Sequence, residues 1–272
     1  MSEKIGTDIE DEVEASRAPL MEHLVELRMR LIRLVIALII GFGICFAFAE
    51  PIYNFLLVPF EDAAARVRDG DLSLELIFTA PLEFFFVKVK LALFGALILA
   101  FPWLAYEIFA FVSPGLYKNE RGAFAPFLLG APGLFVAGMS FVYYFVLPFV
   151  MRFALSQEQL GGENSVSIQL LTRVSDYLNL VTTLILAFGL SFQLPVLLML
   201  LGGAGIVSSR QLMGSWKIAL LGIFVFAAFV TPPDPISQLI LGSVLMGLYG
   251  LSIAGVRMVE KRDRPAAVDA ES

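Results

Sequence analysis

Six long apolar segments determine what this chain of 272 residues can fold into. They lie at about residues 31–49, 84–112, 124–150, 177–201, 213–230 and 236–256. A helix needs about 20 apolar residues to cross the hydrocarbon core of a bilayer, and recurring uncharged stretches are typical of polytopic membrane proteins. We therefore predict an all-α, polytopic membrane protein with six transmembrane helices in one domain, residues 19–258.

The fifth segment is shorter than the others. Its apolar part, residues 218–230, has 13 residues and would cover only about 20 Å as a helix. The run Thr-Pro-Pro-Asp-Pro follows at once, and there Asp234 can cap the sixth helix, with Pro235 in its first turn. We expect a shallow hairpin of two short helices, with a locally thinned bilayer beside it.

The distribution of Lys and Arg predicts the orientation of the chain. If the N-terminus is inside, 13 of the 19 basic residues lie on inner segments and 6 on outer segments. By the positive-inside rule, both termini are then cytoplasmic. The polar, acidic residues 1–18 do not resemble a cleavable signal peptide, and we expect them to form a disordered tail. Residues 259–272 are expected to form a second cytoplasmic tail.

The composition argues against several classes of function. Cys45 and His23 are the only cysteine and histidine, so an intrachain disulfide is impossible, and neither a metal site nor a histidine-based catalytic triad is expected. With a net charge of −6, the chain lacks the basic footprint of a nucleic-acid-binding protein, and no GxxxxGK[ST] nucleotide-binding run occurs. We therefore expect neither an enzyme nor a cofactor.

Two glutamates, Glu26 and Glu120, stand just outside apolar segments on the predicted cytoplasmic side. Glu26 lies four residues before Arg30, so one interpretation is an ordinary intrahelical ion pair. Glu120 follows Pro114 in an ordered turn, where an acid is usually just solvated. The other interpretation is that both carboxylates bind foreign guanidinium groups, which a partly desolvated carboxylate recognises bidentately. Glu107, near the inner end of the second segment, is a third candidate carboxylate.

Gln193 is a deep polar side chain in the fourth apolar segment. An amide inside a bilayer is costly unless it is paired. It can make an interhelical hydrogen bond of about 0.6 kcal/mol, or it can face a cavity or a partner helix. Pro195 lies two residues later and frees a backbone carbonyl nearby, which predicts a local kink.

Four motifs carry a resemblance to a known family. They are HLVELRMRL (residues 23–31), FPWLAYEIFAFVSPGLYKNER (101–121), FGLSFQLPV (188–196) and TPPDPISQ (231–238). Together they resemble TatC, the multispanning core of the twin-arginine protein translocase, over about residues 20–256. The resemblance implies a concave, glove-like arrangement of six helices whose last two are short. It also implies a bacterial or archaeal cytoplasmic membrane and export of folded proteins driven by the proton-motive force.

The resemblance further implies roles for individual residues. Glu26 and Glu120 would bind the paired arginines of a twin-arginine signal peptide. The other matching positions are Arg28, Phe111, Pro114 and Leu116 in the signal-binding region, and Pro59 and Asp234 as structural loop positions. Gln193 replaces a glutamate that TatC often has, which puts a proton-carrying role in doubt and leaves a contact with a partner helix. The implied partners are single-span proteins of the TatA and TatB kind, within a multimeric complex in lipid.

A small-solute or proton-coupled secondary transporter is the alternative function. It would need ionisable groups near the middle of the bilayer and usually internal repeats, whereas the sequence offers Gln193 and no repeat. An intramembrane protease would need a serine and a histidine inside the membrane, and His23 lies outside it. Together with the resemblance to TatC, the sequence favours a signal-peptide receptor over both, whereas without that resemblance the transporter would be preferred.

Overall fold

The computed structural model describes residues 2–67, 76–112, 121–158, 171–230 and 235–268, and most of these residues are helical. The elements are α1 (Ser2–Ala47), α2 (Ala49–Val67), α3 (Glu83–Val112), α4 (Arg121–Phe141), the π-helical segment η2 (Val142–Val146), α5 (Leu147–Ser156), α6 (Val174–Ser191), α7 (Leu194–Gly203), α8 (Ser209–Gly214), α9 (Trp216–Val230) and α10 (Pro235–Val268). The predicted all-α class is confirmed.

Within the described residues, five apolar helical stretches are long enough to cross a membrane: Val25–Ala47, Glu83–Ile108, Gly130–Ser156, Val174–Gly203 and Ser237–Glu260. A sixth apolar helix, α9, has 15 residues and is short, as predicted. The prediction that the last helix is also short is wrong, because α10 has 34 residues and its apolar part alone has 24. The chain is a multi-pass membrane protein.

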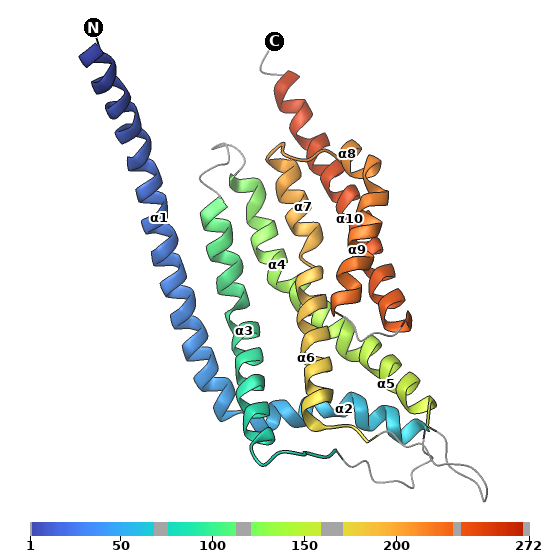
Figure 1. Ribbon diagram of the computed structural model, residues 1–272. Coiled ribbons are helices and arrows are strands. Elements are labelled where there is room, and N and C mark those ends of the chain that lie inside the picture. The colour runs from blue at the N-terminus through green and yellow to red at the C-terminus, as the bar shows by residue number, and fades with distance from the viewer. Residues whose placement is uncertain (1, 68–75, 113–120, 159–170, 231–234, 269–272) are drawn as a thin grey trace, which may run out of the picture.

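The long helices stand side by side, and α2 lies across one end of them (Figure 1). α1 contacts α3, α3 contacts α4 and α6, and α10 contacts both α7 and α9. Both chain ends lie at the opposite end of the bundle from α2 (Figure 1). We call this the terminal end and the other the α2 end.

Small residues let the long helices approach closely, which is typical of helix pairs in membranes. A Cβ atom added to Gly95 of α3 would lie 2.6 Å from the Cys45 sulfur of α1. One added to Gly138 of α4 would lie 2.8 Å from the backbone oxygen of Phe188 on α6. These contacts fix the spacing of α1 against α3 and of α4 against α6.

Pro59 was expected in a loop, and the structure places it inside α2. A proline has no N–H, so it cannot bond the carbonyl four residues earlier, here that of Phe55. The Tyr143 hydroxyl, from η2, donates to that Phe55 oxygen at 2.7 Å, and the Tyr177 hydroxyl donates to the next one, Leu56, at 2.7 Å. α2 therefore continues through its proline and is held by two buried tyrosines.

The two predicted tails also differ from the structure. α1 begins at Ser2, so residues 2–18, which we expected to be disordered, are helical. α10 continues to Val268, so most of residues 259–272 extends that helix. Glu, Ala, Lys and Arg are frequent in both segments and have high intrinsic helix propensity, which favours continuing a helix that the membrane span has already nucleated.

Candidate functional site

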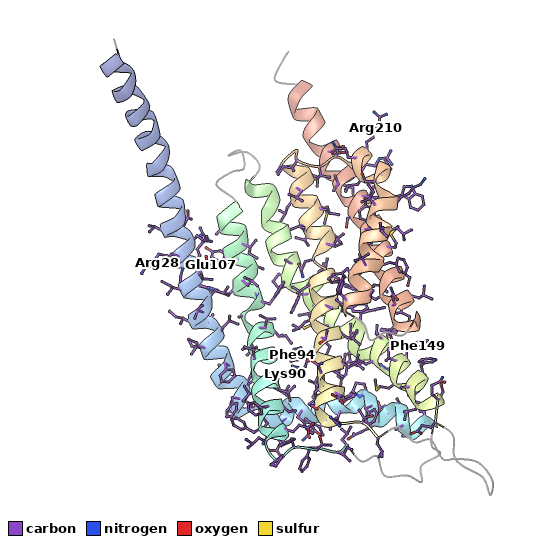
Figure 2. The ribbon with its side chains drawn as sticks, viewed as in Figure 1. Arg28, Lys90, Phe94, Glu107, Phe149 and Arg210 are labelled. Atoms are coloured by element: carbon purple, nitrogen blue, oxygen red, sulfur yellow. The ribbon has the colours of Figure 1, made fainter. Side chains whose placement is uncertain are left out.

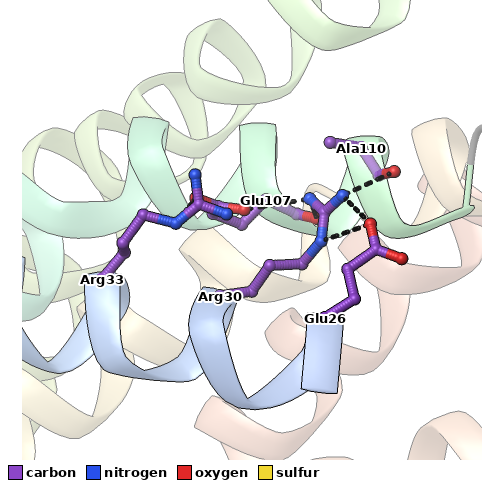
Figure 3. Close-up of polar contacts among 5 residues, drawn as sticks. All are labelled: Glu26, Arg30, Arg33, Glu107 and Ala110. Carbon is purple, nitrogen blue, oxygen red and sulfur yellow. Dashed lines mark hydrogen bonds and ion pairs between the residues drawn. The ribbon is translucent and has the colours of Figure 1, made fainter. Parts of the chain in front are cut away.

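Charged side chains join α1 to α3 (Figure 3), and Glu107 lies in the half of α3 nearer the terminal end (Figure 2). On α1, Glu26, Arg30 and Arg33 are four and three residues apart, so they share one helix face. That face meets Glu107, which projects from α3 (Figure 3). Two carboxylates and two guanidinium groups are thus brought together from two helices.

Arg30 is the centre of this cluster. Its Nε and Nη2 donate to Oε1 of Glu26 at 3.2 and 2.5 Å. Its Nη1 donates to Oε2 of Glu107 at 2.9 Å and to the Glu107 backbone oxygen at 3.2 Å. Its Nη2 also donates to the backbone oxygen of Ala110 at 3.1 Å. An arginine has five N–H donors, so every donor of Arg30 is used.

Glu107 depends on the arginines because it is buried in an unfavourable place. Its side chain is only 6% exposed, against 14% for Arg30. It lies in the last two turns of α3, where the helix dipole disfavours a negative charge. Arg33 approaches it from the solvent side, with Nε 3.4 Å from Oε1, and that oxygen accepts no hydrogen bond from the described residues. A buried carboxylate without a cation would be costly.

Glu26 is the accessible carboxylate of the cluster. Its side chain is 43% exposed, and it forms the predicted intrahelical pair with Arg30. That pairing does not exclude the ligand-binding interpretation, because a carboxylate can accept about four hydrogen bonds. The structure therefore presents a half-exposed acid whose position is set by a nearly buried arginine.

The remaining predicted site residues fall into two groups. Arg28 is exposed on α1 (Figure 2) and, two residues from both Glu26 and Arg30, points away from the cluster. Phe111 lies in the last turn of α3. The positions that lie outside the described residues are Pro114, Leu116, Glu120 and Asp234. The structure thus brings Glu26 together with Glu107 and does not describe its predicted partner Glu120.

Sequence reasoning named Glu107 as a carboxylate but missed its pairing with Arg30. Helical spacing connects residues of one helix and says nothing about which residue of α3 faces α1. A usable signal was present all the same. Glu107 is the only carboxylate within the run 84–112, and a charge at the edge of a membrane span usually has a partner.

Gln193 lies between α6 and α7, which are separated by two residues. Its Nε2 donates to the backbone oxygen of Ala131 on α4 at 2.9 Å, so the interhelical hydrogen bond is confirmed. The interruption next to Pro195 agrees with the expected kink.

An apolar recess of about 470 Å³ lies in the half of the bundle nearer the α2 end. Its lining comes from α1, α2, α3, α4, η2 and α6, and includes Ile44, Phe48, Phe55, Phe94 and Tyr144. No group of three or more His, Cys, Asp or Glu side chains that could hold a metal ion occurs within the described residues.

Comparisons with known proteins give one consistent family. The model of the family described as "Sec-independent protein translocase protein (TatC)" matches residues 22–243. A Magnetococcus marinus protein named "Sec-independent protein translocase protein TatC" is 40% identical, covering 94% of this chain and 90% of that protein. A Rickettsia prowazekii protein of the same name is 41% identical, with coverages of 88% and 92%.

A solved structure agrees with these relatives. It is described as "Crystal Structure of Twin Arginine Translocase Receptor- TatC" and is 34% identical in sequence, with a TM-score of 0.73. The similarity covers 88% of this chain and 99% of that one.

Proposed function

The chain belongs to the TatC family, and we propose that it is the receptor and core subunit of a twin-arginine translocase, which exports folded proteins that carry an Arg-Arg signal peptide. The proposal assigns the chain no catalysis. Its task is to hold two guanidinium groups and the apolar segment that follows them.

The terminal end is the cytoplasmic end in this proposal. Both chain ends lie there (Figure 1), and the inner segments carry 13 of the 19 basic residues. The positive-inside rule then orients the protein in the cytoplasmic membrane. A precursor made in the cytoplasm would reach the Glu26 cluster directly.

Glu26 is the observation that carries the proposal. It is half exposed, it lies at the membrane edge of α1, and Arg30 fixes it from the protein side. A guanidinium group presents a planar fork of donors that matches a carboxylate. By the family resemblance, Glu120 would take the second arginine of the signal, and Arg28, Phe111, Pro114 and Leu116 would belong to the same signal-binding region.

The apolar recess between Ile44 and Phe94 supports the second half of the task. It begins about 18 residues along α1 from Glu26, which is about 27 Å of helix. An apolar signal segment of about that many helical residues would reach it from the arginines. Single-span partners of the TatA and TatB kind would then pack on the exposed apolar faces of the bundle, in a multimeric complex.

Binding of a twin-arginine signal peptide to the full chain in membranes tests the proposal. Glu26→Gln and Glu120→Gln should each weaken binding by about 10- to 100-fold, because each removes a charge-assisted hydrogen-bonded pair. Glu61→Gln is the matched control, since Glu61 is exposed on α2 at the other end of the bundle. Wild-type affinity in both test variants would sink the assignment of the site.

A further inference from the structure

We propose that Arg30 is a positioning residue for signal recognition: anchored on buried Glu107, it fixes the Glu26 carboxylate in the orientation that accepts an incoming guanidinium group. The inference rests on the function proposed above and adds two residues to it. Arg30 does not contact the signal itself in this account. It acts through Glu26.

The first support is the immobility of Arg30. All five of its donors are used, by two carboxylates and by the backbone oxygens of Glu107 and Ala110. Its side chain is 14% exposed. Turning the guanidinium away would leave the buried Glu107 carboxylate without its main donor, so Arg30 keeps its place while ligands come and go.

The second support is the connection that Arg30 makes between two helices. Glu26 and Arg30 belong to α1, whereas Glu107 and Ala110 belong to α3. Because Nη2 bonds both Glu26 and Ala110, the carboxylate of Glu26 is set relative to the end of α3. Arg30 therefore ties the Glu26 carboxylate of α1 to the C-terminal end of α3.

Arg33 provides the contrast. It lies one turn further along α1 and is 49% exposed, and its contact with Glu107 is a single ion pair of 3.4 Å. It balances the charge of Glu107 without ordering Glu26. If the cluster only supplied charge, the two arginines would be interchangeable, and the geometry indicates that they are not.

A competing role for Arg30 would be to occupy Glu26 until a signal displaces it. The two roles predict opposite results when Arg30 is removed: a competitor's removal tightens signal binding, and a positioner's removal weakens it. The double variant Arg30→Met/Glu107→Met allows signal binding to be measured without a change in stability. Replacing a buried ion pair by apolar side chains of similar size is often neutral for folding.

The experiment measures binding of a twin-arginine and a twin-lysine signal peptide to the full chain in membranes. We expect the double variant to unfold thermally like the wild type and to bind the twin-arginine peptide about tenfold more weakly, the loss of about one charge-assisted hydrogen bond. Its preference for arginine over lysine should fall as well, because only arginine needs a fixed carboxylate for a bidentate contact. Arg33→Met is the matched control and should bind within about twofold of the wild type.

If the double variant does not accumulate in the membrane, Arg30→Lys can replace it in the binding experiment. Lysine keeps the charge but has three donors, so binding should fall by an intermediate factor. Tighter binding in either variant would make Arg30 a competitor and overturn the inference. Unchanged binding and preference, with Glu26→Gln still defective, would overturn the inference alone. Unchanged binding in Glu26→Gln too would overturn the proposed function with it.

Discussion

The two ends of α3 each carry a glutamate, and the two carboxylates are satisfied in different ways. At the α2 end, Glu83 accepts from the backbone N–H groups of Thr79 and Ala80 at 2.7 and 3.3 Å. It also accepts from the hydroxyls of Thr79 and Ser175, at 3.3 and 2.5 Å. At the terminal end, Glu107 relies on two guanidinium groups from another helix.

The helix dipole explains why the two ends differ. Glu83 is the first residue of α3, where a negative charge is favourable, and neutral donors suffice to hold it. Glu107 lies near the last turn, where the dipole opposes its charge, so cations are required. At the α2 end, the Glu83 carboxylate is therefore satisfied by neutral donors within the protein. The terminal end gathers positive and negative groups that can be shared with a charged ligand.

Of the substitutions considered, removal of Arg30 at the terminal end should lower the free energy of unfolding most. Arg30→Ala leaves Glu107 buried with only Arg33 beside it, which should lower the free energy of unfolding by about 2 to 3 kcal/mol. Thermal unfolding of the purified protein in detergent measures this. Arg28→Ala, an exposed residue on the same helix, should change stability by less than about 0.5 kcal/mol. Equal effects of the two substitutions would contradict the structural role given to Arg30.

Removing one hydrogen bond at the α2 end should lower the free energy of unfolding by less than removing Arg30 does. Tyr143→Phe takes the donor from the Phe55 oxygen and should cost about 1 kcal/mol of unfolding free energy. Tyr144→Phe is the control, since Tyr144 is 67% exposed and adjacent. In the background Pro59→Ala, the new N–H can bond Phe55, so the cost of Tyr143→Phe should shrink. If Tyr143→Phe lowered the free energy of unfolding equally with Pro59 and with Pro59→Ala, the hydrogen bond from Tyr143 would not be compensating for the proline.

The interhelical hydrogen bond of Gln193 should contribute still less to the free energy of unfolding than the Tyr143 hydrogen bond does. Gln193→Leu removes its contact with Ala131, and such bonds contribute about 0.6 kcal/mol on average. Signal binding should stay measurable in this variant, because the residue is far along the chain from the Glu26 cluster. Export by the assembled complex is the sensitive readout. Wild-type export together with wild-type stability would reduce Gln193 to a packing residue.

Glu83→Gln should leave binding of the signal peptide unchanged. The amide keeps one acceptor oxygen, which can still accept from the Thr79 and Ala80 N–H groups, while its NH2 group replaces the oxygen that accepts from Ser175, so the turn before α3 loosens without being lost. Affinity for a twin-arginine peptide should match the wild type, while thermal stability falls slightly. A loss of affinity comparable to that of Glu26→Gln would show that the two ends of α3 are not functionally distinct.

The sequence predicted most of the scaffold and one half of the site. Apolar segment length identified the spans, and i,i+4 spacing predicted the contact between Glu26 and Arg30. The bond between Arg30 and Glu107 joins residues 77 positions apart, which no local pattern encodes. Pro59 was assigned to a loop through the family resemblance, and nothing in the local sequence predicted a helix that continues through a proline. Here a tertiary hydrogen bond from Tyr143 to Phe55 offsets the loss.

Site-directed photocrosslinking to a twin-arginine precursor is the most direct test of recognition at the terminal end of α1 and α3. A photoreactive residue at Met29, exposed on α1 and three residues from Glu26, should crosslink the signal region, and one at Leu82, exposed at the α2 end, should not capture the arginines. Crosslinking at Met29 should disappear with a twin-lysine precursor or with Glu26→Gln. Persistence of the Met29 crosslink in Glu26→Gln, or its absence in the wild type, would contradict this account.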